Sequence, residues 1–262
     1  MASSARRVIH ELGEASATVR SAVKARRFGF ALRLLSCVIV NVGQLTIGSL
    51  VRRRQCPCCE WQGVGFLWSA NETRTATDAV CPSCQSRSRH RAERLLVPLV
   101  VKAASTDAVL HFAPEAQLLP SLRAYLPHAR YQTADLYRED VDLPGQDIQR
   151  LDLADSSFDL VICNHVLEHV LDDAASVAEI ARVTTPRGVA IVTIPGVWER
   201  VETVHFDEVD DNGHWRDYGT GAQDLFTGAF ADVKTFVSTD LSPTPARFGI
   251  RASEPIFVCR KG

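Results

Sequence analysis

The sequence predicts an α/β protein whose main domain is built on a parallel sheet, with a small cysteine-rich module in front of it. From about residue 105 onward, strand-like runs rich in Val and Ile alternate with helical stretches. That alternation is typical of a parallel sheet covered by helices on both faces. Five of the eight cysteines lie between Cys56 and Cys84, which favours a metal site in a reducing compartment over a disulfide framework.

Composition supports a soluble protein with one large core. The chain has 262 residues, of which 46% are hydrophobic and 23% charged, enough for one domain and a small module. Its net charge of −2 and pI of about 6.4 give no general attraction for nucleic acid. We therefore expect a cytoplasmic protein without a nucleic-acid partner, and the N-terminal segment leaves membrane association open.

Residues 1–54 are expected to form a helical segment. The run "LLSCVIVNVGQLTIGSLV" (34–51) carries no charge and has the length of a short membrane span, since roughly 17–25 residues are needed. Asn41, Gln44 and Gly48 recur at helical spacing and would form one polar stripe, which favours an amphipathic helix. Residues 28–54 could then pack on the protein itself, on a second subunit of a homodimer or on a membrane surface.

Residues 55–86 predict a zinc ribbon. "QCPCCEW" and "CPSCQSRSRHR" supply two C-x-x-C knuckles, Cys56 with Cys59 and Cys81 with Cys84, which complete a tetrahedral Zn²⁺ site. Four thiolates leave no open coordination position, so the zinc is expected to be structural. Cys58 could replace Cys56 or Cys59 as a ligand.

Residues 87–104 are expected to form a linker helix. "SRSRHRAERLLVPLVVKAA" carries Arg87, Arg89, Arg91 and Arg94 near its start and apolar residues later. Such a run is more often a solvated or acid-paired face than a phosphate-binding one.

Residues 105–262 predict the α/β domain. Strands are expected at 108–113, 130–136, 158–164 and 188–194, with helices at 115–125 and 172–183. A helix at 221–230 and two further strands within "VKTFVSTDL" and "EPIFVCRKG" indicate an antiparallel end to the sheet.

The order of these motifs resembles a known family. "VLHFAPE", "YQTADLY", "QDIQRLDLADSSFDLVICNHVLEHV" and "EIARVTTPRGVAIVTIP" together resemble the class I S-adenosylmethionine-dependent methyltransferases, over roughly 105–262. They are most similar to a subgroup with an N-terminal four-cysteine module and an L-H-F-A-P-E first motif. The resemblance implies a Rossmann-like seven-stranded sheet with an antiparallel last hairpin, and methyltransferase activity (EC 2.1.1.-). Ala113, Pro114 and Arg187 depart from it by standing where glycines are expected, as does "CEW" in the ribbon.

The resemblance also implies a site for the donor, S-adenosylmethionine. Ala113 is expected to keep the turn small, and Pro114 to begin a helix whose N–H groups meet the donor carboxylate. Asp135 is expected to accept hydrogen bonds from the ribose hydroxyls, and Asp147 with Ile148 to meet the adenine. The full set of expected donor-binding residues is His111, Phe112, Ala113, Pro114, Glu115, Asp135, Leu136, Asp147, Ile148, Asn164 and His165.

The acceptor site is expected in the long insertion after the strand at 188–194, "PGVWERVETVHFDEVDDNGHWRDYG". His214 is the first candidate for a general base and His165 the second, although a structural role fits each equally well. The expected substrate-binding residues are His205, Trp215, Arg216 and Tyr218. A catechol-type metal site in "DEVDDN" is disfavoured because those acids are adjacent in one loop.

These features favour methylation of a small molecule, most simply a hydroxyl of a sugar or secondary metabolite. "NHVL" lacks the motif that binds a planar amide, which argues against N-methylation of a nucleobase. Two alternatives stay open: an RNA methyltransferase that docks through the ribbon, and a non-catalytic donor-binding protein.

Overall fold

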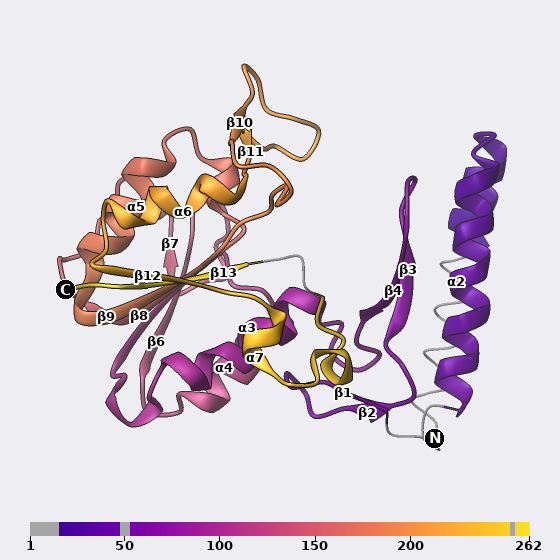
Figure 1. Ribbon diagram of the computed structural model, residues 1–262, viewed down its shortest axis with the longest axis horizontal. Coiled ribbons are helices and arrows are strands. Elements are labelled where there is room, and N and C mark those ends of the chain that lie inside the picture. The colour runs from indigo at the N-terminus through magenta and orange to yellow at the C-terminus, as the bar shows by residue number, and fades with distance from the viewer. Residues whose placement is uncertain (1–15, 48–52, 252–254) are drawn as a thin grey trace. The chain divides into compact units, whose positions relative to one another are not determined.

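A computed structural model describes residues 16–47, 53–251 and 255–262, which divide into two compact units (Figure 1). Unit 1 comprises residues 1–92 and 244–251, and unit 2 comprises residues 93–243 and 252–262. The division falls inside the segment that the sequence marks as a linker helix, here α3 (Ser88–Val100).

In unit 1, the long apolar run is the helix α2 (Phe28–Ile47), which packs against the strand β3 (Leu67–Ala70). Asn41 is buried there, because its side chain donates to the Trp68 carbonyl (3.0 Å) and accepts from the Trp68 amide (2.7 Å). The predicted polar stripe therefore faces protein at Asn41, while Gly48 lies outside the described residues. By length and composition, residues 28–46 could cross a membrane, but only 17% of this window is buried.

The rest of unit 1 is a pair of short hairpins around the cysteines. β1 (Arg54–Gln55) pairs with β2 (Gln62–Gly63), and β3 pairs with β4 (Thr75–Val80), both antiparallel. Its small core consists of Phe66 and two of the cysteines. A bound metal, which the four-cysteine motif predicts, would stabilise a module with so small a core.

Unit 2 is built on one seven-stranded sheet with the order β12-β13-β9-β8-β5-β6-β7. The strands are β5 (Ala108–Phe112), β6 (Arg130–Asp135), β7 (Leu143–Pro144), β8 (Phe158–Asn164), β9 (Thr184–Thr193), β12 (Asp232–Phe236) and β13 (Ile256–Arg260). The pairs from β7 to β9 are parallel, whereas β13 runs antiparallel to both β9 and β12. The predicted fold class, a Rossmann-like sheet with an antiparallel last hairpin, is confirmed.

Helices cover both faces of this sheet (Figure 1). The main ones are α4 (Leu119–Tyr125), α5 (Asp173–Val183) and α6 (Gln223–Thr227), with the short α7 (Ser238–Leu241) after β12. The side chain of Asp172 caps α5 by accepting from the Ala175 amide (2.8 Å). The expected helix start near Pro114 is wrong: residues 115–118 form turns, and α4 begins only at Leu119.

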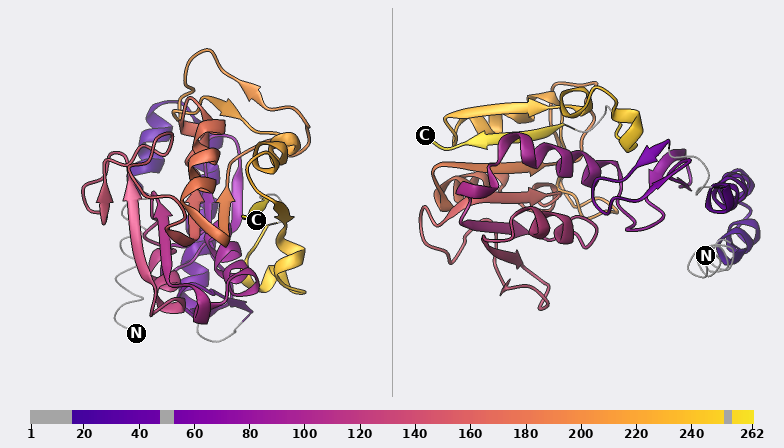
Figure 2. Two further views of the ribbon diagram at one scale, coloured as in Figure 1. Left: turned by 90° about the vertical axis from the view of Figure 1, so that its left-hand side faces the viewer. Right: turned by 90° about the horizontal axis from the view of Figure 1, so that it is seen from below.

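The sheet places a crevice at the carboxyl end of β5. The strand order changes direction there, because β5 lies between β6 and β8. Ligands of open α/β sheets bind at such points. The insertion after β9, which contains β10 (Val204–His205) and β11 (Arg216–Asp217), extends beyond the same end of the sheet (Figure 2).

Candidate functional site

A cavity of about 700 Å³ lies at the carboxyl ends of β5, β6 and β8, within unit 2. This size is within the range of ligand pockets, about 300–1,000 Å³. Eight of the residues predicted for donor, base or acceptor roles line it: Phe112, Ala113, Asp135, Leu136, Asp147, Ile148, His165 and Trp215.

The turn after β5 is made by a strained alanine. Ala113 has φ of +45°, in the left-handed region that favours glycine, and its amide donates to the Ala134 carbonyl (2.8 Å). The sequence therefore keeps the backbone shape of a glycine turn without the glycine. The expected role of Pro114 as the first residue of a helix is wrong, because α4 begins five residues later.

Two carboxylates line the cavity with their orientation fixed by local turns. One oxygen of Asp135, Oδ1, accepts from the amides of Tyr137 (2.9 Å) and Arg138 (3.1 Å). Oδ1 of Asp147 accepts in the same way from the amide of Gln149 (2.9 Å). A carboxylate that is held by its own turn is preorganised to accept hydrogen bonds from a diol or an amine.

His165 lines the cavity and comes directly after β8. It also has a left-handed backbone, with φ of +51°, and its amide donates to the Thr193 carbonyl (2.8 Å). Its Nδ1 lies 3.4 Å from Oε1 of Glu168, a carboxylate that is 1% exposed. Strained residues often mark functional sites, so His165 is a stronger candidate for chemistry than its sequence position suggested.

Four of the expected donor-binding residues do not line the cavity. His111 is fully buried in β5, where its Nδ1 lies 2.9 Å from the Tyr131 hydroxyl, and burial lowers its pKa to about 4. Asn164 is also buried, donating to Glu93 (2.6 Å) and accepting from Thr193 (2.9 Å). The other two expected residues that do not line the cavity are Pro114 and Glu115.

The expected acceptor residues are mostly structural. Arg216 is buried, forms an ion pair with Asp173 (2.9 Å) and donates to the carbonyls of Leu167 and Leu171. The Tyr218 hydroxyl donates to Asp173 (2.8 Å), and burial raises the pKa of this phenol. These contacts attach β11 to the segment after β8, so direct substrate contact by Arg216 and Tyr218 is not supported.

The two remaining acceptor candidates also lie outside the lining set. His205 is an exposed residue of β10. His214, the first candidate for the base, packs edge-on against His169, with ring centroids 4.9 Å apart, and its Nδ1 lies 3.5 Å from Asp210. Its neighbours Gly213 and Trp215 do line the cavity.

Sequence reasoning missed Glu93 and Asp173. Neither lines the cavity, but their side chains bind residues of the segments around it. Glu93 is a buried acid in an arginine-rich helix, three and four residues before the buried Leu96 and Val97. That helical spacing was a signal that Glu93 faces the core. Asp173 gave no such signal, because its partners lie more than forty residues away along the chain.

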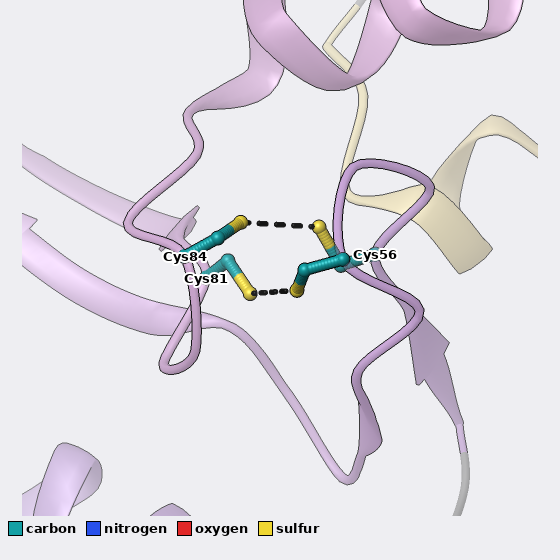
Figure 3. A group of neighbouring side chains, drawn as sticks. Cys56, Cys81 and Cys84 are labelled. Carbon is teal, nitrogen blue, oxygen red and sulfur yellow. Dashed lines mark hydrogen bonds between the residues drawn. The ribbon is translucent and has the colours of Figure 1, made fainter. Parts of the chain in front are cut away.

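The four cysteines of the two knuckles converge in unit 1 (Figure 3). The Sγ atoms of Cys56 and Cys84 are 3.7 Å apart, as are those of Cys59 and Cys81. Four thiolates around one zinc ion at Zn–S distances of 2.3 Å would be separated by about 3.8 Å, so this geometry fits the ion. The Cys58 thiol instead lies 3.6 Å from the His90 carbonyl, outside the cluster.

The sequence predicted that the basic run of α3 is a solvated or acid-paired face. The structure shows that part of this run is buried. Arg91 is fully buried, with its guanidinium 4.0 Å from the centre of the Phe66 ring and its N–H groups donating to backbone carbonyls. Arg94 packs over the Tyr125 ring at 5.5 Å. Arg91 and Arg94 therefore have protein partners that restrict any phosphate contact.

Comparison with known proteins finds a family model that matches part of the chain. Residues 120–192 match the family model described as "Methyltransferase domain". No curated protein matches the sequence.

Solved structures with a similar fold have low sequence identity. The 1,6-didemethyltoxoflavin-N1-methyltransferase of Burkholderia thailandensis, solved with S-adenosylhomocysteine, is 15% identical, with 65% of this chain and 78% of that chain covered and a TM-score of 0.46. An O-methyltransferase family protein of Burkholderia thailandensis is 11% identical (66% and 57% covered, TM-score 0.44). The YcgJ protein of Bacillus subtilis is 13% identical (66% and 99% covered, TM-score 0.42).

Proposed function

We propose that this chain is an S-adenosylmethionine-dependent methyltransferase that transfers the methyl group to a hydroxyl of a small molecule such as a sugar or secondary metabolite. The match of residues 120–192 to a methyltransferase domain supports the proposal. The observation that carries the proposal is the cavity at the carboxyl ends of β5, β6 and β8. Its lining includes a tight turn, two oriented carboxylates, an imidazole and an indole.

The donor would occupy the side formed by β5 and β6. Ala113 lets the chain turn closely beneath the methionine end, Asp135 accepts from the ribose hydroxyls, and Asp147 with Ile148 meets the adenine. The sulfonium methyl is already activated, so the protein mainly has to align donor and acceptor. Such alignment can supply up to about 7–11 kcal/mol of the barrier.

The acceptor would lie beside His165 and Trp215. A hydroxyl must lose its proton as the O–CH₃ bond forms and the S–CH₃ bond breaks, and His165 is the lining residue suited to accept that proton. The buried Glu168, 3.4 Å from Nδ1, would orient the ring. We therefore prefer His165 to His214 as the base, reversing the order suggested by the sequence.

Turnover with labelled donor tests this function. The purified chain is incubated with isotopically labelled S-adenosylmethionine and a panel of hydroxylated metabolites, and products are identified by mass spectrometry. His165→Ala should reduce turnover by about 10²–10⁴-fold with little change in donor affinity. Asp135→Ala should instead weaken binding of S-adenosylhomocysteine by at least about tenfold, while the exposed Asp140→Ala should not.

RNA methylation is the competing function, and the buried Arg91 argues against the basic docking surface that it would require. Binding of single-stranded RNA that weakens steeply with salt would favour it, because phosphate contacts release counterions. Failure to bind the donor product would instead contradict both enzymatic functions.

We also propose that the four cysteines hold a structural Zn²⁺, as the S···S distances of 3.7 Å support. Their binding energy, on the order of 10–16 kcal/mol, would fold a module with almost no core.

A last proposal concerns α2, which would lie on an anionic membrane surface. Its face opposite Asn41 exposes four large apolar side chains: Phe28, Leu32, Leu35 and Ile39. Residues 16–47 contain five basic residues and no acidic one. A helix with one apolar face and basic neighbours is suited to the lipid interface, whereas a buried, hydrogen-bonded Asn41 is not suited to a span.

A further inference from the structure

We propose that Glu168, His169 and His214 bind a divalent transition-metal ion at the wall of the cavity. Each offers one ligand atom, and these atoms lie within 4.8 Å of one another. The group is separate from the cysteine cluster, because it belongs to unit 2. Its chemistry rests on the proposed methyl transfer, but its existence does not.

Two segments bring the three side chains together. Glu168 and His169 end the turn Leu167–His169 after β8, and His214 lies in the loop before β11. The Trp215 amide donates to the Glu168 carbonyl (2.8 Å), and His169 Nδ1 lies 3.1 Å from the Gly213 carbonyl. These contacts fix the loop beside the turn, so the ligand set is held in place by the backbone.

The hydrogen bond of His169 sets its tautomer. A carbonyl can only accept, so Nδ1 of His169 carries the proton and Nε2 carries the lone pair. That Nε2 lies 3.8 Å from Oε1 of Glu168, which also offers only lone pairs as a carboxylate. With the ring neutral, these two acceptors would face each other, and a cation between them would remove their repulsion. An imidazole whose Nδ1 is bonded to a carbonyl is the usual form of a metal-binding histidine.

Glu168 itself provides the second, independent observation. The side chain is 1% exposed, and its Oε2 has no hydrogen-bond partner among the described residues. Burial of a carboxylate without full compensation costs several kcal/mol. His214 is arranged like a ligand as well, since its Nδ1 lies 3.5 Å from Asp210, which could orient its ring.

Two imidazoles and one carboxylate suit Zn²⁺, Fe²⁺, Co²⁺ or Mn²⁺, and they leave coordination positions open. His169 lines the cavity together with Gly213 and Trp215, so the open positions would be accessible to the acceptor. An acceptor hydroxyl bound there would lose its proton to His165 more easily, and its oxygen would then take the methyl group from the sulfonium. The expected acceptor class is a molecule with an oxygen ligand beside the methylated hydroxyl.

Cobalt binding to the full chain tests the site without donor or acceptor. The chain is loaded with zinc, weakly bound metal is removed by dialysis, and Co²⁺ is titrated while the visible spectrum is followed. We expect one Co²⁺ per chain, with weak bands of nitrogen and oxygen ligation and no thiolate charge-transfer band. His169→Ala and His214→Ala should each weaken binding by at least about tenfold, whereas the exposed His128→Ala should not.

Retained melting temperature and retained binding of S-adenosylhomocysteine would show that the variants are folded. No cobalt binding by the parent chain at concentrations on the order of 1 mM would overturn the metal site, and a proton shared by the histidines and Glu168 would then explain the cluster. Equal binding by His214→Ala would overturn it too. A chain that binds cobalt but not the donor product would refute the proposed function alone.

Discussion

Ala113 and Arg187 show that a backbone shape can persist where its usual residue is absent. Both stand where the resemblance led us to expect glycine, and both have left-handed φ values, +45° and +66°. A side chain in this conformation costs about 1–2 kcal/mol. The hydrogen bond from Ala113 to Ala134 and the paired strands around it must offset that cost, so the turn is imposed by the sheet.

Ala113→Gly should therefore keep or raise the stability of unit 2. Relief of the left-handed strain favours the variant by about 1–2 kcal/mol, and the greater freedom of glycine in the unfolded chain removes about 0.5–1 kcal/mol of that gain. Ala134→Gly is the matched control, because Ala134 is a buried residue of β6 without a positive φ. We expect it to lose roughly 1 kcal/mol in urea unfolding, and an equal loss for Ala113→Gly would contradict the strain.

The buried His111 should make stability depend on pH. Its folded pKa of about 4 is below the ordinary 6.5, so protons bind preferentially to the unfolded chain. Stability is then complete above pH 6.5 and falls as the pH decreases toward 4, by up to about 3 kcal/mol. His111→Gln should flatten the unfolding free energy between pH 6.5 and 4.5. If the unfolding free energy of this variant depends on pH as steeply as that of the parent chain, groups other than His111 cause the dependence.

Residues at strand ends were predictable, whereas those defined by distant partners were not. Phe112 and Asp135 are the last residues of β5 and β6, and His165 directly follows β8. Such strand ends meet at one edge of a parallel sheet. Asn164 also lies at a strand end, so its sequence position predicted the same role. Its side-chain amide instead donates to Glu93, 71 positions away. A single sequence carries little information about such pairs, and for this reason Asn164 was expected in the donor site although it does not line the cavity.

At the scale of elements, periodicity predicted strands better than helix ends. The strands β5, β6, β8 and β9 agree with expectation to within a few residues, because apolar runs mark them. The two-residue β7 had no such signal and was not expected at its position. The start of α4 was placed too early, since proline favours the first helical turn in general. Here Pro120, inside the first turn of α4, takes that position instead of Pro114.

The apolar face of α2 gives a prediction at this scale. Leu32 and Ile39 are 70% and 66% exposed, so Leu32→Ser with Ile39→Ser should leave the fold intact. Binding of the full chain to vesicles that contain phosphatidylserine should weaken at least about tenfold, because each side chain contributes above 1 kcal/mol when buried in lipid. Vesicles of phosphatidylcholine alone should bind the parent chain more weakly.

Replacing two exposed apolar residues of unit 2, Leu99→Ser with Val204→Ser, is the control and should not alter vesicle binding. The contrary result would be a parent chain that is a dimer and does not bind vesicles, with the α2 variant a monomer. That result would assign the apolar face of α2 to contact with a second copy of the chain.

At the scale of the whole molecule, the four clustered cysteines and the cavity proposed for the donor belong to different units. All four thiols lie in unit 1, and every residue that lines the cavity lies in unit 2. The core of unit 2 joins strands, α5 and α6 in one cluster of buried residues. Beside the described cysteines, by contrast, lie the buried Phe66 and the partly buried Trp61. The two units should therefore depend on zinc very differently.

Removal of zinc should unfold the ribbon and spare the cavity. A strong chelator, or Cys81→Ser with Cys84→Ser, should abolish hydrogen-exchange protection of residues 55–86, because their small core cannot hold the fold alone. Protection of β5 and β6 should remain, and affinity for S-adenosylhomocysteine should change less than about threefold. Cys58→Ser is the matched control and should retain the zinc, since that thiol lies outside the cluster. Loss of donor binding together with zinc would show that unit 2 needs the ribbon, and would contradict the independence of the two units.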